Sequence, residues 1–192
     1  MIKAYGIGHR LLLYFLKITC LIQKRRDSMD ITITLLSLKD EAELFEFEKK
    51  NRQFFEMLVP GRGDDFYQFE TFQIRHRNLL KEQEISESFF YLIKDERGNI
   101  LGRVNLFDIN PTNRSAEIGF RVGLEYCSKG IASEALKLLL ESHSDLTLKA
   151  KTTINNLGSQ KVLERAEFKV VAVDENSFEM NGQKLRFIHY IR

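Results

Sequence analysis

The chain has 192 residues, 43% of them hydrophobic, so it can bury one core but is too short for two full domains. Its 29 basic and 27 acidic side chains give a formal net charge of +2, which provides no electrostatic reason to expect a nucleic-acid or membrane partner. The two cysteines lie far apart and the four histidines are scattered. We therefore expect no disulfide framework and no metal site, and a reducing, cytoplasmic compartment.

The first 28 residues differ from the rest. The apolar run from Leu11 to Ile22 is 12 residues long and contains Lys17, which is too short to span a bilayer at about 1.5 Å per residue. A signal peptide is an alternative, but the QKRRDSMD that follows lacks the small residues of a cleavage site. We interpret residues 1–28 as an extension from an upstream start codon, either an extra helix or a disordered tail, and expect one domain over residues 29–192.

Helices dominate the next part of the chain. The alternation over residues 31–36 predicts a strand, and SLKDEAELFEFEKKN predicts a helix with Ser37 as N-cap and Asp40 at the capping-box position. After the turn PGRGDD, we expect a second helix of about 18 residues from about Asp65. This helix carries three aromatic residues that we interpret as core: Phe66, Phe69 and Phe72.

The middle of the chain is predicted to form antiparallel strands. Residues 88–93 and 100–109 make a hairpin, and SAEIGFRV (115–122) makes a further strand. The alternation of that strand places Glu117 on the face opposite its apolar neighbours. The remaining predicted elements are a helix over 130–142, a strand near 145–152, a helix over 159–166, a strand over 168–173 and a last strand over 184–192.

The stretch EYCSKGIASEAL places small residues and a lysine at the start of a predicted helix. A helix N-terminus presents unpaired backbone N–H groups and a partial positive charge, so it attracts phosphate. Gly130 and Ala132 leave room for a phosphate to approach those amides, and Lys129 adds a full charge. The alternative is that the small residues only ease a turn from strand to helix.

The order of these segments resembles the GNAT superfamily of N-acetyltransferases, in its branch of ribosomal-protein alanine and serine N-acetyltransferases. Gly130 and Ala132 match the last two named positions of the family signature (Gln/Arg)-x-x-Gly-x-(Gly/Ala), and Asn156 and Ser159 match its Asn-x-x-Ser block. FEKKNRQFFEMLVPGRGDDFY resembles the N-terminal helices of the branch, so the resemblance extends over residues 31–192.

The resemblance implies a mixed, mostly antiparallel α/β sheet of six to seven strands with helices on both faces. The sheet is expected to splay between the strand of Glu117 and the strand around Leu148, with acetyl-CoA in the splay. The resemblance implies three groups of acetyl-CoA-binding residues. The strand binds through the backbone of Phe120, Arg121 and Val122, and Asn156 contributes from the later block. The third group is the loop and the start of the next helix: Cys127, Ser128, Lys129, Gly130, Ile131, Ala132 and Ser133.

Acetyl transfer to an amine needs a base for the amine and a proton for the departing thiolate. Glu117 is the candidate base, directly or through water; otherwise it is an ordinary strand glutamate. In the branch it resembles, a serine at Ser159 is proposed to donate the proton, whereas locally it would simply cap the next helix. Asn156 is either a CoA ligand, as the resemblance implies, or a turn residue.

Three residues around the turn between the first two helices are candidates for the acceptor site: Arg52, Arg62 and Tyr67. Cys127 near a helix start and Lys129 is expected to have a lowered pKa, but no base is placed to activate it, so we expect direct transfer from CoA.

The sequence departs from the family pattern at Cys127, at Ser128, where Gly is common and a positive φ would be costly, and at Glu167, where Gly is usual. We expect an N-acetyltransferase that acts on a protein N-terminal amine, as a monomer or homodimer. The alternatives are a small-molecule amine acetyltransferase and a CoA-binding protein without turnover.

Overall fold

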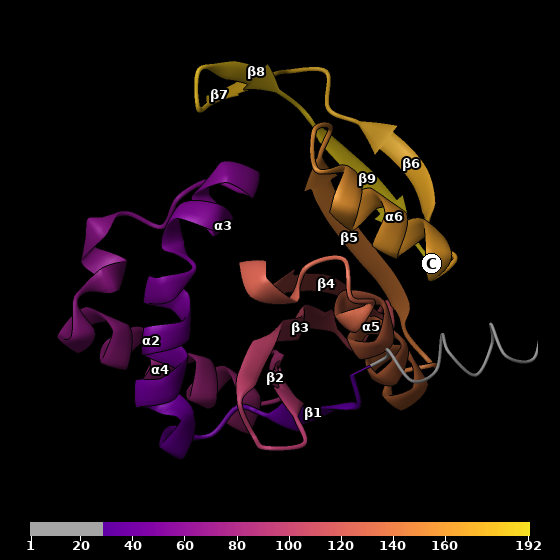
Figure 1. Ribbon diagram of the computed structural model, residues 1–192. Coiled ribbons are helices and arrows are strands. Elements are labelled where there is room, and N and C mark those ends of the chain that lie inside the picture. The colour runs from indigo at the N-terminus through magenta and orange to yellow at the C-terminus, as the bar shows by residue number, and fades with distance from the viewer. Residues whose placement is uncertain (1–28) are drawn as a thin grey trace, which may run out of the picture. The chain divides into compact units, whose positions relative to one another are not determined.

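A seven-stranded sheet forms the centre of the protein in the computed structural model, which describes residues 29–192 (Figure 1). The strand order is β1-β2-β3-β4-β5-β9-β6, and only the β4–β5 pair is parallel, which confirms the mixed, mostly antiparallel sheet. The strands are β1 (Ile31–Leu35), β2 (Phe89–Asp95), β3 (Ile100–Asn110), β4 (Ser115–Val122), β5 (Thr147–Thr153), β6 (Lys169–Val173) and β9 (Phe187–Ile191). The predicted N-terminal extension lies outside the described residues.

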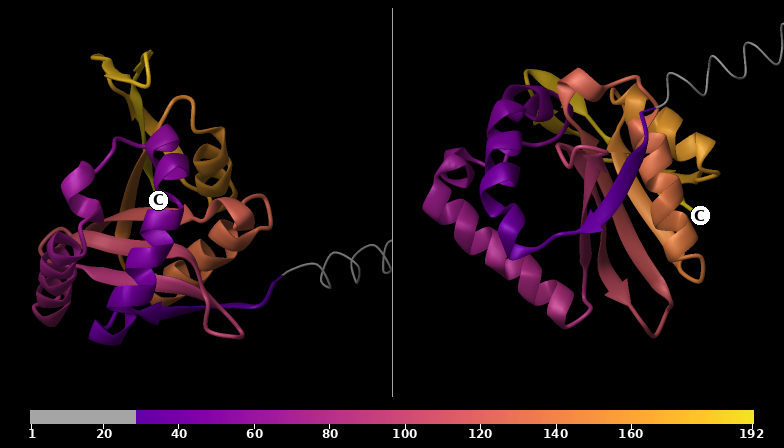
Figure 2. Two further views of the ribbon diagram at one scale, coloured as in Figure 1. Left: turned by 60° about the vertical axis from the view of Figure 1, so that its left-hand side comes forward. Right: turned by 60° about the horizontal axis from the view of Figure 1, so that its bottom comes forward.

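Helices cover both faces of the sheet, as Figures 1 and 2 show. One face carries η1 (Leu38–Asp40), α2 (Glu41–Lys50), α3 (Arg52–Leu58), η2 (Asp64–Tyr67) and α4 (Phe69–Glu84). The other carries α5 (Ile131–Ser142) and α6 (Leu157–Arg165), with η3 (Leu124–Tyr126) leading into α5. A separate hairpin is formed by β7 (Phe178–Met180) and β8 (Gln183–Leu185). Within residues 29–192, no helix is both long enough and apolar enough to cross a membrane.

Two hydrophobic cores lie on the two faces because successive strand residues point to opposite sides of a sheet. In β2, Leu92 belongs to the core under α2, α3 and α4, whereas Ile93 belongs to the core under α5 and α6; both side chains are fully buried. In β4, Ala116 and Ile118 face the α5 side. Glu117 therefore lies on the opposite face, as its alternation predicted.

Two helix boundaries differ from the sequence prediction. The predicted second helix starts at Phe69 rather than Asp65, because Asp64–Tyr67 form a 3-10 turn and Gln68 has an extended backbone. Phe69 is consequently 37% exposed, while Phe66 and Phe72 are core residues as expected.

The first predicted helix, residues 37–51, ends where expected, but its start differs. It opens as the 3-10 turn η1, where the Asp40 carboxylate accepts hydrogen bonds from the backbone N and Oγ of Ser37 at 2.9 and 2.5 Å. α2 ends at Lys50, and the side chain of Asn51 fixes this end: its Nδ2 donates to the Phe47 carbonyl (2.9 Å), and its Oδ1 accepts from the distant Leu124 amide (3.0 Å). The short helix α3 follows directly and was not among the predicted elements. The predicted last strand divides into β8 and β9.

The sheet opens between β4 and β5. Their parallel pairing ends at Ile118 and Ala150, yet β4 continues to pair with β3 as far as Val122, and β5 continues to pair with β9 as far as Thr153. Residues 119–122 of β4 and 151–153 of β5 therefore diverge, while β4 stays paired with β3 and β5 stays paired with β9. This divergence is the splay expected from the sequence, and it exposes backbone N–H and C=O groups along both inner edges.

Candidate active site

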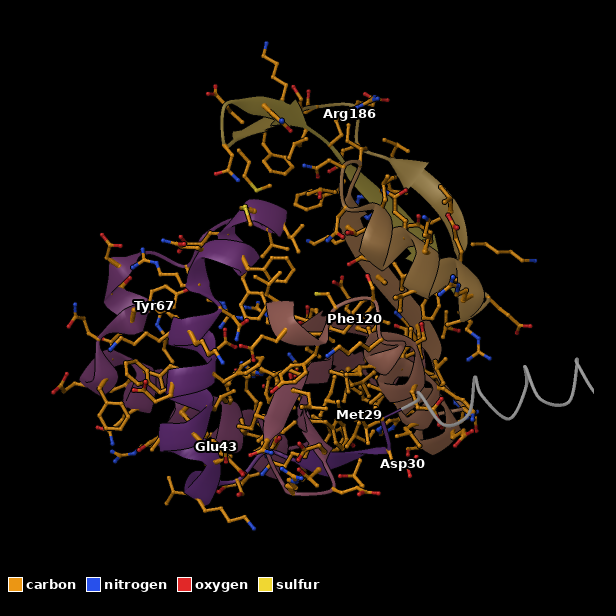
Figure 3. The ribbon with its side chains drawn as sticks, viewed as in Figure 1. Met29, Asp30, Glu43, Tyr67, Phe120 and Arg186 are labelled. Carbon is orange, nitrogen blue, oxygen red and sulfur yellow. The ribbon has the colours of Figure 1, made fainter. Side chains whose placement is uncertain are left out.

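A cavity of about 620 Å³ occupies the splay. Four segments line it: α3, the end of β4, the η3–α5 loop with the first turn of α5, and the β5–α6 loop with α6. Figure 3 shows Phe120, one of its lining residues, toward the middle of the molecule between the α2–α4 layer and α6. The lining residues predicted from the sequence are Phe120, Arg121, Val122, Cys127, Ser128, Gly130, Ile131, Ala132, Ser133, Asn156 and Ser159.

The start of α5 has the backbone geometry of an anion-binding loop. Gly130 is the N-cap residue with a left-handed backbone (φ 81°), and a Cβ placed there would meet no atom within 4 Å. Ile131 is buried and anchors the first turn, while Ala132 and Ser133 line the cavity. The first residues of α5 thus lie on the cavity, at the positive end of the helix dipole, which fits a phosphate group there.

Asn156, rather than Ser159, caps α6. The helix begins at Leu157, and the Oδ1 of Asn156 accepts a hydrogen bond from the Ser159 backbone N at 3.1 Å. The predicted cap role for Ser159 is therefore wrong, because the helix starts two residues earlier than its apolar pattern indicated. Gln160 braces the same loop by donating to the carbonyls of Thr153 (3.2 Å) and Ile154 (3.0 Å).

A buried ion cluster joins β4 to the helices on the opposite face from α5. Glu48 of α2 is completely buried, and its two carboxylate oxygens pair with Arg103 (3.2 Å) and Arg121 (3.1 Å). Burial by itself raises the pKa of Glu48, but the charges of Arg121 and Arg103 outweigh burial and hold the pKa below its usual value. Arg121 also lies over the ring of Phe55, 4.9 Å from its centroid.

Comparison with known proteins identifies the family. Residues 30–169 match the family model of the acetyltransferase (GNAT) domain. The chain belongs to the GNAT acetyltransferase family. It is 30% identical over 160 residues to "Probable N-acetyltransferase YjcK" of Bacillus subtilis (strain 168), covering 79% of this chain and 87% of that protein. The described fold and the open cavity at the start of α5 agree with an acetyl-CoA-dependent N-acetyltransferase.

Solved structures support the fold of this GNAT domain. One is RimL, a ribosomal L7/L12 alpha-N-protein acetyltransferase in complex with coenzyme A, with a TM-score of 0.78, 18% identity, and coverage of 84% of this chain and 93% of that chain. Another is the ribosomal-protein-S5-alanine acetyltransferase of Vibrio fischeri, with a TM-score of 0.76, 20% identity, and coverage of 84% and 92%.

The GNAT domain keeps left-handed backbone at both positions where glycine is usual in the family. Ser128 has φ 61° and Glu167 has φ 66°. A non-glycine residue has a steric cost in this region, so Ser128 and Glu167 both strain the backbone.

Cys127 differs from the sequence expectation in its chemistry. Its Sγ lies 3.6 Å from the Gly123 carbonyl, to which the thiol donates, and burial raises the pKa of the thiol. The expectation of a lowered pKa is therefore wrong, because partial burial disfavours the charged thiolate. Lys129 itself does not line the cavity; its Nζ lies 5.7 Å from the centroid of the Tyr126 ring.

The residues predicted to border the acceptor lie close to one another but do not line the cavity. The Arg52 guanidinium stacks over the Tyr67 ring at 4.3 Å and forms ion pairs with Glu56, at 3.0 Å, and with Asp64. Burial is the main cause that lowers the pKa of Arg62 to about 10, and repulsion by Arg121 adds to it. None of Arg52, Arg62 and Tyr67 lines the cavity; the wall on this side consists of Phe54, Phe55 and Leu58 of α3 and of Val59, which follows it.

Glu117 lies just inside the closed part of the sheet. It pairs with Phe107 of β3 and Lys149 of β5, one residue before the last β4–β5 pair, and it does not line the cavity. It shares a face of β4 with Arg121, four residues further along, because residues an even number apart point the same way.

Three charged residues of the GNAT domain were missed by the sequence analysis. Lys161 and Arg165 line the cavity from α6, and their spacing of four along a predicted helix was the signal that could have found them. Glu48 falls in register with the apolar positions Leu44 and Phe45 of α2, which marks it as buried. Within residues 29–192, no group of three or more His, Cys, Asp or Glu side chains could hold a metal ion.

Proposed function

We propose that this GNAT enzyme transfers the acetyl group of acetyl-CoA directly to the N-terminal amine of a protein. The single observation that carries the proposal is the cavity, which is lined by the start of α5 on one side of the sheet and by α3 on the other. Acetyl-CoA approaching from α5 and an acceptor approaching from α3 can therefore meet in the splay. The two solved relatives, which are named for acetylating ribosomal proteins, support a protein acceptor.

The residues of the chain have distinct proposed roles in this reaction. The amides at Gly130 to Ser133 bind phosphate groups of CoA, and the cations Lys161 and Arg165 lie on the same cavity. The free edge of β4 over residues 119–122 receives the pantetheine arm, in the manner of an added strand. Binding in this cradle orients the thioester and holds it away from water.

Proton transfer is assigned to two residues. Ser159 lines the cavity, and its backbone N rather than its hydroxyl serves the helix cap, so we propose that the hydroxyl donates a proton to the leaving thiolate. Glu117 is proposed as the base for the amine. Because it does not line the cavity, a water must relay the proton to it. The raised pKa of Cys127 favours direct transfer over a covalent thioester on the enzyme.

The test is CoA release from acetyl-CoA with a panel of acceptors: peptides that begin with serine or alanine, the same peptides blocked at the N-terminus, and small primary amines. The proposal expects the highest kcat/KM for the free peptides, with mass spectrometry placing the acetyl group on the α-amine, and no release with the blocked peptides. Higher kcat/KM for small amines would instead identify a small-molecule enzyme. Binding of acetyl-CoA without release for any acceptor would identify a CoA-binding protein.

A further inference from the structure

Three guanidinium groups surround one buried carboxylate beside the cavity. Arg103 and Arg121 are both ion-paired with Glu48, and the charge of Arg62 acts on Glu48 and on both other arginines. The acids of α3 and η2 are paired with other arginines: Glu56 and Asp64 with Arg52, and Asp65 with Arg75. The Glu48 cluster, by which we mean Glu48, Arg62, Arg103 and Arg121, therefore carries two positive charges in excess.

This excess is costly because the cluster is largely removed from water. The side chains of Glu48 and Arg103 are 0% and 4% exposed, and the Nε of Arg103 is buried with no hydrogen-bond partner among residues 29–192. Tying α2 to the sheet requires one guanidinium on Glu48. Arg103 alone would supply that tie, so Arg62 and Arg121 add positive charge beyond it and create a site of positive potential for an anion.

Arg121 is the member of the Glu48 cluster that reaches the cavity. It lines the cavity, and its side chain is 23% exposed. A guanidinium has five N–H donors, and within the described residues the only side-chain hydrogen bond of Arg121 is the one from Nη1 to Glu48. Its remaining donors are available to a ligand, and two of them can form a bidentate pair of hydrogen bonds with a carboxylate.

The face of β4 on which Arg121 lies indicates whether its anion belongs to CoA or to the acceptor. Arg121 projects to the side of α2 and α3, where it stacks on Phe55, whereas Gly130 and the phosphate-binding loop belong to the side of α5. The phosphates of CoA thus lie at the opposite end of the cavity. The anion that meets Arg121 belongs to the acceptor.

We propose that Arg121 is a specificity-determining residue that binds a carboxylate of the acceptor within the first three residues of its N-terminus. This inference rests on the proposed function above. An extended peptide advances about 3.3–3.6 Å per residue, so a side chain at the second or third position lies within reach of the Arg121 guanidinium when the amine is in the splay. Arg62 and Arg103 increase the positive potential at that point.

The experiment compares matched peptides that differ only in charge, with Ser-Glu or Ser-Gln at the start and, in a second pair, Glu or Gln at the third position. In the wild type, we expect kcat/KM to be at least about tenfold higher for the better Glu peptide than for its Gln partner, which is the size of one charge-assisted hydrogen bond. In Arg121→Gln, the ratio should fall to about one. Arg121→Lys keeps the charge but loses the bidentate geometry, so its ratio should be intermediate.

Arg114→Gln is the matched control, because Arg114 is an exposed residue that pairs with Asp145 outside the cavity. It should keep the wild-type ratio. Thermal unfolding with and without acetyl-CoA shows which variants are folded. If Arg121→Gln fails to fold, the test uses the Glu-to-Gln ratio of kcat/KM in the wild type and in Arg121→Lys: the inference requires a high ratio in the wild type and a lower one in Arg121→Lys.

Two results would overturn the inference: equal kcat/KM for the Glu and Gln peptides in the wild type, or a preference that persists in folded Arg121→Gln. Calorimetric binding of the N-acetylated Glu and Gln peptides to the enzyme with CoA measures the same preference without turnover. Absence of transfer to every peptide, together with tighter binding of the Glu product, would therefore contradict the proposed function and leave the role of Arg121 standing. Equal or absent binding of both products would contradict the role of Arg121.

Discussion

Ser128 and Gly130 both hold left-handed backbone on the two sides of Lys129, with φ angles of 61° and 81°. Only glycine adopts this conformation without steric cost. These two left-handed residues turn the chain from η3 into α5, and the first residues of the helix line the cavity. Gly130 tests cofactor binding at this loop, and Ser128 tests its backbone strain.

Acetyl-CoA is expected to raise the melting temperature of the wild type, and Gly130→Glu is expected to remove that rise. Ligand at a hundred times its Kd stabilises the folded state by about 2.7 kcal/mol, or several degrees for a domain of this size. A carboxylate at Gly130 repels the phosphates and fills their space. Gly182→Glu is the control, because Gly182 also has positive φ (70°) and open space around its Cβ but lies in the β7–β8 turn. An unchanged shift in Gly130→Glu would contradict the phosphate-binding role of the loop.

Ser128→Gly and Glu167→Gly are each expected to stabilise the protein, by about 0.5–1 kcal/mol, since relief of left-handed strain exceeds the entropy that glycine adds to the unfolded chain. Denaturant unfolding of each variant measures the change. Glu134→Gly, a glutamate in the first turn of α5, should be destabilised by a similar amount because glycine weakens a helix. Loss of stability in both Ser128→Gly and Glu167→Gly would show that their side chains contribute more than their strain costs.

Asn156→Ala is expected to lower the free energy of unfolding by about 1 kcal/mol, because its Oδ1 caps α6 through the Ser159 amide. Ser159→Ala keeps that backbone amide, so its stability should be unchanged while its kcat falls. Thermal unfolding and CoA release measured on both variants separate the two effects. A stability loss in Ser159→Ala equal to that in Asn156→Ala would return Ser159 to a structural role.

Glu117→Gln is expected to lower kcat by about 10²-fold or more, which is the usual size for a general base, while acetyl-CoA binding is retained. The substitution keeps the shape of the side chain, and Glu117 is outside the cavity lining, so the thermal shift with acetyl-CoA should match the wild type. Steady-state CoA release and the thermal shift are the two measurements. A kcat equal to that of the wild type would make Glu117 an ordinary strand residue.

A chain that begins at Met29 is expected to fold and to bind acetyl-CoA like the full chain. The domain has its own first strand, β1, which pairs with β2 from Ile31 onward, and the family match begins at residue 30. Melting temperature and light-scattering mass of the two chains provide the comparison. A fall of several degrees, or a dimer that becomes a monomer, would show that residues 1–28 contribute to stability or assembly.

The sequence by itself determined the elements whose signals are local. The alternation of SAEIGFRV predicted β4 with its exact bounds, Ser115–Val122, because side chains in a strand have a period of two and only one face of this strand was apolar. The small residues of SKGIA predicted the start of α5, because a left-handed N-cap and exposed amides depend on the residues of that loop alone. The order of these segments was enough to indicate the family.

The tertiary structure decided the features that depend on residues far apart in the chain. The point where β4 leaves β5, after Ile118 and Ala150, depends on how β3 and β9 hold each strand, and no local pattern encodes it. The pairing of Glu48 with Arg103 and Arg121 likewise joins residues 55 and 73 positions apart. Electrostatic interactions act through space, so the charge beside the cavity became visible only when folding brought these side chains together.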